Sequence, residues 1–359
     1  MSALAHARRK KITNADVRHF PRKHCLGLFH PCAEICAKVG KRIAGHSDLE
    51  PQLRAPTFPH MSSSAADFRH WEISDAAVFE DAPGGLVRLR VSTRLCNAEV
   101  WLHGAHVTHF QRAGEEPLLF LSAASHFAHG KPIRGGVPVI FPWFGPRAGR
   151  SDSPAHGFAR TLPWDVEALA SDERGNVSLT LRLDSSDATR AHWPHEFILR
   201  HRIAFGAKLD MEMEVENSSA APVEFEEALH TYLSVSDVRN VSVTGLENTA
   251  YLDKVDALQR KMEAAEPIRI TGETDRIYLN TRTTCVLDDP GLSRRIVVEK
   301  SGSDATVVWN PWIAKAKAMS DFGDEEWPAM LCIESANTGE SAITLSPGAT
   351  HTMRATISA

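Results

Sequence analysis

The stretch "LDMEMEVE" (Leu209–Glu216) alternates apolar and acidic side chains without a break. A period of two residues is typical of an antiparallel strand with one face in the core and the other in water. The stretch "VSLTLRL" (Val177–Leu183) alternates in the same way. Both segments therefore predict half-buried strands, with the polar residues facing outward.

The pattern continues along the chain after residue 61. Six further segments predict strands: Val87–Val91, Val241–Thr244, Arg295–Glu299, Thr306–Trp309, Ala342–Leu345 and Met353–Ile357. Turn clusters such as "DERGN" and "SPGAT" separate them. Only Asp253–Ala265 looks helical, and strands do not alternate with helices. We therefore expect an all-β protein, with one large antiparallel β-sandwich over residues 61–359.

Residues 1–60 have a different character. They hold eleven Lys and Arg against four Asp and Glu, although the whole chain has a net charge of −5. The body is therefore acidic and lacks the broad basic face that nucleic acid requires. The basic segment is either a disordered or targeting extension, or sequence upstream of a true start at Met61. We favour the start at Met61, because nothing in residues 1–60 looks able to fold alone.

Composition also bears on membranes, disulfides and metals. No run of about 18 apolar residues is present, so we expect no membrane span. Six cysteines in 359 residues do not indicate a disulfide scaffold, and a cytoplasmic protein fits. Cys25, Cys32 and Cys36 lie near His24 and His30, but they lack the CxxC spacing of zinc sites. We expect no metal.

The stretch "KPIRGGVPVIFPWFGPR" (Lys131–Arg147) is the first of five that interrupt the strand pattern. Lys131 and Arg134 are suited to pairing with an anion, and a Gly-Gly turn lets the backbone approach a ligand. The flat faces of Trp143 and Phe144 suit the C–H face of a sugar, and Trp143 is the candidate substrate-binding residue. The competing interpretation is an ordinary loop with its aromatic residues in the core and its charges in water.

Three further stretches place polar residues beside apolar ones. "HGFAR" carries His156 and Arg160, "FEEALHTYLSV" carries His230, and "GETDRIYLN" carries Asp275 ahead of a predicted strand. A histidine with an ordinary pKa near 6.5 suits proton transfer at neutral pH. Each residue also has a structural interpretation, as a hydrogen-bonding core histidine, an ion pair or a turn cap.

Glu334 gives the sharpest individual signal. It follows Met330–Ile333, a run typical of a buried strand. Burying a carboxylate costs several kcal/mol unless it is bonded or functional. The position therefore favours either a general base with a raised pKa or a structural ion pair.

In their order, the blocks "KPIRGGVPVIFPWFGP", "HGFAR", "ALHTYL", "DRIY", "VVWNPW" and "CIESAN" resemble the aldose 1-epimerase superfamily. They are most similar to its hexose-6-phosphate mutarotase branch, the glucose-6-phosphate 1-epimerases. The resemblance covers roughly residues 70–355 and leaves out residues 1–60. It implies a large β-sandwich of the galactose-mutarotase type with an active site in a cleft across one sheet.

The resemblance also implies roles for individual residues. His230 matches the general acid and Glu334 the general base, while Arg134 matches the arginine at the sugar phosphate. Asp275 matches a substrate-binding aspartate. The remaining substrate-binding candidates are His156 and Arg160, which match pocket residues, and Lys131 and Trp143, which rest on our own reasoning from the loop.

The expected activity is the interconversion of the α and β anomers of glucose 6-phosphate or a related hexose 6-phosphate. Such chemistry needs no cofactor, and its small-molecule partner is a sugar phosphate. Two alternatives stay open, namely an epimerase of unphosphorylated aldoses and a non-catalytic carbohydrate-binding sandwich. We expect a monomer.

Overall fold

The computed structural model describes residues 63–147, 149–150 and 153–359, all of which belong to one compact unit. The expectations for residues 1–60, for a start at Met61 and for the cysteines before it lie outside the described residues. Within the described part of the chain, no helix is long and apolar enough to cross a membrane.

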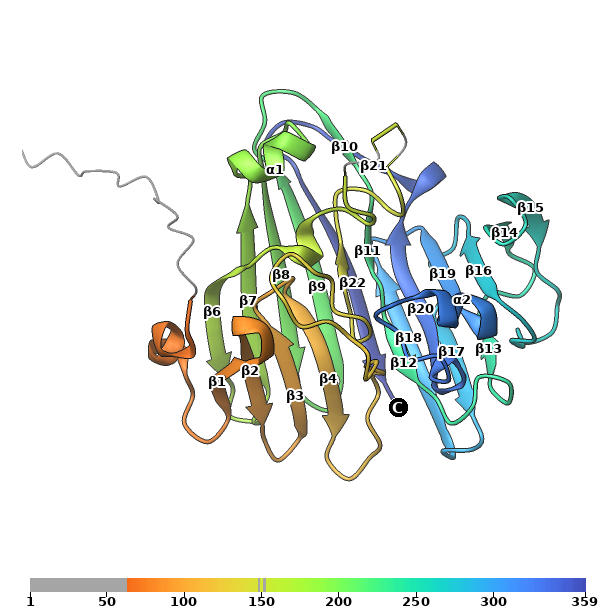
Figure 1. The fold of residues 1–359 in the computed structure, drawn as a ribbon, viewed down its shortest axis with the longest axis horizontal. Helices are drawn as coiled ribbons and strands as arrows, with labels where there is room; N and C mark the ends of the chain where they lie inside the picture. The colour runs from red at the N-terminus through yellow and green to blue at the C-terminus, as the bar shows by residue number, and fades with distance from the viewer. Residues whose placement is uncertain (1–62, 148, 151–152) are drawn as a thin grey trace, which may run out of the picture. The chain divides into compact units, whose positions relative to one another are not determined.

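An eight-stranded antiparallel sheet forms one layer (Figure 1). Its strands, in spatial order, are β13 (Ser242–Thr244), β17 (Cys285–Asp289), β18 (Arg294–Ser301), β22 (Thr350–Ser358), β9 (Leu209–Asn217), β8 (Phe197–Phe205), β7 (Val177–Asp184) and β6 (Asp165–Ser171). Five strands predicted from the sequence lie in this sheet, which confirms the antiparallel β prediction for these segments.

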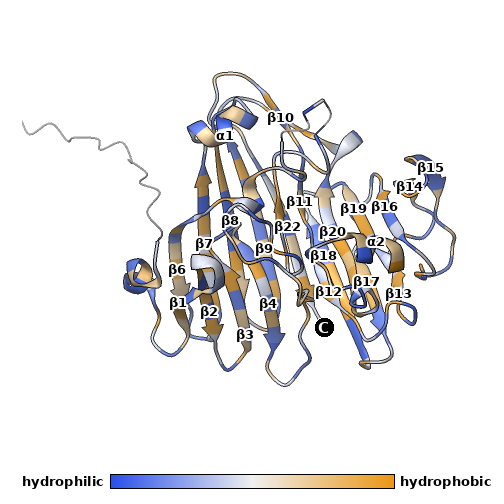
Figure 2. Ribbon diagram, viewed as in Figure 1, coloured by the Kyte–Doolittle hydropathy of each residue, from blue (hydrophilic) through white to orange (hydrophobic). Residues whose placement is uncertain are grey.

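Strand β9 shows why the alternation was informative. Leu209, Met211, Met213 and Val215 are completely buried, whereas the acidic residues between them are half-exposed. Figure 2 shows the same alternation of hydrophobic and hydrophilic residues along the neighbouring strands β7 and β8. One face of this sheet therefore packs on the core and the other meets water.

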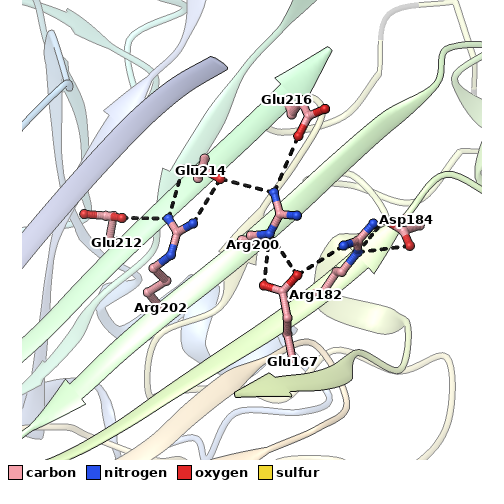
Figure 3. Close-up of polar contacts among 8 residues, drawn as sticks. All are labelled: Glu167, Arg182, Asp184, Arg200, Arg202, Glu212, Glu214 and Glu216. Carbon is pink, nitrogen blue, oxygen red and sulfur yellow. Dashed lines mark hydrogen bonds and ion pairs between the residues drawn. The ribbon is translucent and has the colours of Figure 1, made fainter. Parts of the chain in front are cut away.

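Charged residues on the outer face form a network across four strands (Figure 3). Arg200 Nε lies 2.9 Å from Glu167, and its Nη1 lies 3.3 Å from Glu214 and 3.5 Å from Glu216. Arg202 pairs with Glu212 at 2.8 Å and also with Glu214. These cross-strand pairs explain the acidic face of β9, because its charges are matched by arginines on β8.

A second eight-stranded sheet carries two residues of the predicted site, Asp275 and Glu334. Its main path is β15 (Gln259–Met262), β14 (Ala250–Asp253), β16 (Thr274–Tyr278), β19 (Ala305–Asn310), β20 (Met330–Asn337), β11 (Glu227–Leu229) and β5 (Val139–Ile140), and β12 (Tyr232–Ser234) also pairs with β20. Every residue of β20 is buried, because both of its faces are covered. Strand β20 is thus a central strand of the sandwich.

Two smaller sheets and several short helices complete the fold. The sheets are β1 (Ala77–Ala82), β2 (Leu86–Ser92), β3 (Cys96–Trp101) and β4 (His106–Arg112), and the pair β10 (Val223–Phe225) and β21 (Ile343–Leu345). The helices are α1 (Asp187–His192) and α2 (Trp312–Ala318), with 3-10 turns at Ala65–Trp71, Pro83–Gly85, Ala159–Thr161, Trp327–Ala329 and Gly339–Ser341. One hydrophobic core joins residues of all these sheets, as a β-sandwich requires.

The helix predicted over Asp253–Ala265 is wrong. This segment is a hairpin in which β14 ends at Asp253 and β15 returns from Gln259. The Asp253 carboxylate accepts hydrogen bonds from the backbone N–H groups of Val255 and Asp256, which closes the turn. A local side-chain acceptor of this kind stabilises a turn at the expense of a helix.

Candidate active site

The register of strand β20 places His230 directly opposite Glu334. Leu229 at the end of β11 pairs with Ser335, and Tyr232 at the start of β12 pairs with Cys332. Both pairs obey one register, so the intervening His230 lies across from Glu334. The side chains of directly opposed residues point to the same face. His230 Nε2 accordingly lies 3.4 Å from Glu334 Oε1.

Aromatic rings hold the imidazole of His230 in place. It stacks on the Tyr232 ring with centroids 4.8 Å apart, and the edge of Trp309 meets it at 5.9 Å. The His156 ring approaches at 5.8 Å. His230 Nδ1 and Glu334 Oε2 have no hydrogen-bond partner among the described residues. The pair therefore retains free polar atoms in a buried setting.

Burial shifts both members of the pair toward their neutral forms. It raises the pKa of Glu334 well above its ordinary value, and the nearby Asp275 carboxylate raises it further. Burial also lowers the pKa of His230 well below its ordinary value, and the positive charges of Arg160 and Arg134 act in the same direction. Both groups are therefore favoured in their neutral forms, a carboxyl group beside a neutral imidazole.

Asp275 lies on the same face of the sheet, in strand β16, and not ahead of a strand as the sequence indicated. It pairs in register with Trp309 of β19, which pairs with Cys332 of β20. Two lysines flank its carboxylate: Lys254 Nζ lies 3.2 Å from Oδ2 and Lys315 Nζ lies 3.8 Å away. Asp275 is therefore held by cations on the face of the sheet that carries His230 and Glu334.

Arg134 reaches the same face from the loop before β5. Its Nη2 pairs with Asp321 Oδ2 at 3.0 Å, and its Nη1 donates to the Tyr232 hydroxyl oxygen at 3.0 Å. Burial lowers the pKa of Arg134, but Tyr232 and Asp321 together raise it above its ordinary value. The guanidinium therefore carries a fixed positive charge in a defined orientation.

Arg160 and His156 form the adjoining wall. Arg160 is 8% exposed, its Nη2 donates to the carbonyl oxygen of Ala155 at 2.8 Å, and its Nε has no partner among the described residues. Burial lowers the pKa of Arg160 to about 10, and the charge of Arg134 contributes. His156 Nδ1 accepts a hydrogen bond from the Gly145 N–H at 3.3 Å. The pKa of His156 is lowered, chiefly by burial.

These residues line one cleft of about 290 Å³. It contains six of the eight site residues predicted from the sequence, namely Arg134, His156, Arg160, His230, Asp275 and Glu334. The rest of its lining is Phe144, Ala155, Lys254, Trp309, Lys315 and Met319. Four cationic side chains and two carboxylates thus line a space of a size suited to a small ligand.

Trp143 and Lys131 do not line this cleft. Trp143 is 7% exposed, its ring meets Phe158 edge-on, and its Nε1 donates to the Pro154 carbonyl oxygen. The following residue, Phe144, faces the cleft in its place. Lys131 is exposed. Its backbone carbonyl oxygen pairs with His103 Nε2, and its backbone N–H donates to the Ala128 carbonyl oxygen.

The Gly-Gly turn serves packing more than ligand approach. Gly135 and Gly136 have φ angles of 115° and 61°. A Cβ atom on Gly135 would meet the Phe120 carbonyl oxygen at 2.5 Å, and one on Gly136 would meet the Val107 carbonyl oxygen at 2.2 Å. The glycines therefore let the loop pack against neighbouring backbone, which fixes the position of Arg134.

Sequence reasoning missed the two lysines of the cleft. Lys254 directly follows β14 in the segment expected to be helical, and Lys315 lies on the short helix α2. Both look like ordinary surface lysines in the sequence, because only the strand pairing brings them to Asp275. No cluster of His, Cys, Asp and Glu with metal-binding geometry occurs among the residues that the structure describes.

Comparisons with known proteins identify the family of this chain. A family model described as Aldose 1-epimerase matches residues 87–358. The chain belongs to the aldose 1-epimerase family. This aldose 1-epimerase is an isomerase, and its chemistry interconverts sugar anomers. The family resemblance inferred from the sequence blocks is confirmed.

Two relatives and one solved structure support this assignment. A protein from Cenchrus ciliaris, provisionally named glucose-6-phosphate 1-epimerase, is 37% identical over 275 residues, covering 74% of this chain and 82% of the relative. One of the same name from Escherichia coli K12 is 38% identical over 240 residues, covering 67% and 79%. The crystal structure of a provisionally described mutarotase from Salmonella typhimurium superposes with a TM-score of 0.75 at 32% identity, covering 80% of this chain and 94% of that one.

A galactose mutarotase related enzyme from Lactobacillus acidophilus superposes with a TM-score of 0.60 at 16% identity, covering 75% of this chain and 96% of that one. That likeness concerns the fold alone. It confirms the expected β-sandwich of the galactose-mutarotase type.

Proposed function

We propose that this epimerase interconverts the α and β anomers of a hexose 6-phosphate, with glucose 6-phosphate as the reference substrate. The observation that carries the acid–base part is the 3.4 Å separation of His230 Nε2 and Glu334 Oε1. The two sugar oxygens that exchange protons, O1 and O5, are bonded to the same carbon. An acid and a base only a few ångströms apart therefore serve both oxygens at once.

Ring opening follows from this placement. Glu334 takes the proton of the anomeric hydroxyl while His230 gives a proton to the ring oxygen, and the C1–O5 bond breaks to leave an aldehyde. Rotation about C1–C2 presents the other face of the carbonyl. In ring closure, His230 takes the proton of the C5 hydroxyl and Glu334 returns one to O1.

The protonation states of the pair fit such a cycle. Ring opening turns an ionised Glu334 and a protonated His230 into a carboxyl group and a neutral imidazole, and ring closure does the reverse. Burial favours the second state, which is the one that accompanies the open-chain sugar. Both states carry one proton, so no proton needs to enter from water during a turnover.

The charge of the cleft supports a phosphorylated substrate. Arg134, Arg160, Lys254 and Lys315 line it against only two carboxylates, Asp275 and Glu334. Asp321 and Glu273 partly neutralise Arg134 and Lys315, whereas Arg160 is buried and has no ion pair among the described residues. A buried cation of this kind favours an anion, and arginine suits the geometry of a phosphate oxygen pair. The names of the relatives from Cenchrus ciliaris and Escherichia coli point to the same substrate. We assign the phosphate to the side of the cleft formed by Arg134 and Arg160, called the arginine wall below.

Anomer exchange measured by NMR tests the proposal. The protein is added to equilibrated glucose 6-phosphate, or to glucose, and magnetisation transfer between the α and β H1 signals is followed. We expect fast exchange with the phosphate, lost in Glu334→Gln. Equal exchange with both sugars would retain the acid–base pair and discard the phosphate specificity. Exchange with neither would leave a carbohydrate-binding sandwich as the better interpretation.

A further inference from the structure

Tyr232 touches both halves of the cleft. It begins strand β12, pairs with Cys332 of β20 and is 1% exposed. Its hydroxyl oxygen accepts a hydrogen bond from Arg134 Nη1 at 3.0 Å. Its ring lies nearly parallel to the His230 imidazole, with an angle of 12° and centroids 4.8 Å apart. One side chain therefore joins the arginine wall to the acid–base pair.

The surroundings leave Tyr232 little freedom. The edge of Trp309 meets the Tyr232 ring at 5.7 Å and the His230 ring at 5.9 Å, so the three rings form one packed group. A displacement of Tyr232 would change the plane of the imidazole and the direction of the Arg134 guanidinium together. Close packing transmits small shifts of this kind, because no void absorbs them.

The phenol itself is not a proton-transfer group. Burial raises the pKa of Tyr232 above its ordinary value, so the hydroxyl stays neutral across the working range of pH. Its action on the reaction is therefore through its two neighbours. The hydroxyl acts on Arg134 and the ring acts on His230, which makes the two actions separable by substitution.

We propose that Tyr232 is a positioning residue that aligns Arg134 with the substrate's anionic group through its hydroxyl and fixes the His230 imidazole through its ring. This inference rests on the proposed hexose-phosphate activity. Of the two parts of Tyr232, only the hydroxyl, through Arg134, affects the discrimination between anionic and neutral sugars. It also explains why a fully buried tyrosine keeps a polar atom directed at a charged side chain.

Two substitutions separate the two actions. Tyr232→Phe keeps the stacked ring and removes the acceptor of Arg134. We expect KM for glucose 6-phosphate to rise about 10-fold, with kcat and the exchange rate for glucose within about twofold of wild type. Tyr232→Leu also removes the ring. We expect kcat to fall at least about 10-fold for any sugar that the wild type accepts, because the imidazole is no longer held.

Tyr278→Phe is the matched control. Tyr278 is equally buried in the same sheet, but its hydroxyl donates to Glu263, which does not line the cleft. We expect its kinetics to match wild type. The inference is overturned if Tyr232→Phe behaves like this control, or if it slows both sugars equally. Because the Phe variant preserves the packed ring, the result stands even if the Leu variant fails to fold.

The outcomes also separate this inference from the proposed function. Failure of the wild type to exchange glucose 6-phosphate overturns the proposed function and the inference with it. A wild type that is active on the phosphate, beside a Tyr232→Phe variant with unchanged KM, overturns the inference alone. Inorganic phosphate provides a second readout, since Tyr232→Phe should weaken its competitive inhibition by the same factor as it raises KM.

Discussion

His230 and Glu334 face each other across adjacent strands, with Nε2 and Oε1 3.4 Å apart and both side chains almost fully buried. In the proposed cycle a single proton is on one group or the other, so a substitution at either position disables both. This relationship sets what substitutions at the two positions should do.

Glu334→Gln and His230→Asn should each lower the anomer exchange rate by about 10²–10⁴-fold, the usual contribution of a general acid or base. The double variant should lose little more than the worse single variant, because the two groups act as one unit. The check is magnetisation transfer on all three proteins at one pH. Multiplicative losses would show that the residues act independently and would contradict the shared-proton cycle.

Arg134→Ala should raise KM for glucose 6-phosphate much more than it alters the kinetics of free glucose. Its guanidinium is the one cation of the cleft that is fixed by both a carboxylate and a tyrosine hydroxyl. Loss of a charge-assisted contact to phosphate is expected to cost about 10–100-fold in KM. Exposed Lys131→Ala serves as the control and should leave KM unchanged. Equal effects of Arg134→Ala on both sugars would remove its phosphate role.

Charges beside the pair should move the pH profile in opposite directions. Lys254 lowers the pKa of both Glu334 and His230, so Lys254→Met should shift the profile of kcat/KM to higher pH. Because Glu334 has the higher pKa of the pair, loss of the pair's last proton at the alkaline limb follows Glu334. Asp275 raises the pKa of Glu334, so Asp275→Asn should shift the alkaline limb to lower pH. The readout is the pH at which each limb falls, and not the size of kcat/KM, because both substitutions also change the lining of the cleft. Shifts of the same sign would contradict the assignment of the limbs to this pair.

Much of this architecture could be predicted from the sequence. The strict alternation of β9 defined its buried face, and Glu334 stood out because a carboxylate interrupted a buried run. The hairpin at Asp253 was missed, because its turn depends on a side-chain acceptor and not on periodicity. Trp143 was placed at the sugar, but its neighbour Phe144 faces the cleft. Which of two adjacent aromatics points inward depends on tertiary packing, which a local pattern does not contain.

The arginine network on the outer sheet face should stabilise the fold measurably at low salt. The Arg200 side chain is 18% exposed and lies within 3.5 Å of three glutamates, whereas the Arg90 side chain is 54% exposed and, within the described part of the chain, pairs with Glu80 alone. Arg200→Met should lower the free energy of unfolding by about 1 kcal/mol and Arg90→Met by less than about 0.5 kcal/mol. Urea unfolding gives both values. In about 1 M salt the difference should shrink, since exposed pairs are screened. An Arg200 effect that is indifferent to salt would point to packing of its aliphatic stem.

Acid should destabilise the protein through His106, which supports the loop that carries Arg134. His106 is completely buried and its Nε2 lies 2.7 Å from the Gly135 carbonyl oxygen, while its Nδ1 has no partner among the described residues. Burial lowers the pKa of His106 to about 3. The folded state therefore prefers the neutral ring, and the unfolded chain, with a pKa near 6.5, binds the extra proton.

The direction in which stability changes with pH follows from this difference in pKa. The stability held by neutral His106 is fully present above about pH 6.5 and is lost progressively as the pH falls toward about 3, at about 1.4 kcal/mol per pH unit. His106→Gln keeps a donor for Gly135 but cannot take up a proton. Urea midpoints between pH 7 and pH 4.5 should therefore fall less steeply for His106→Gln than for wild type. His70→Gln, at an exposed histidine, should run parallel to wild type. Identical slopes for all three proteins would show that His106 does not control the acid response of this loop.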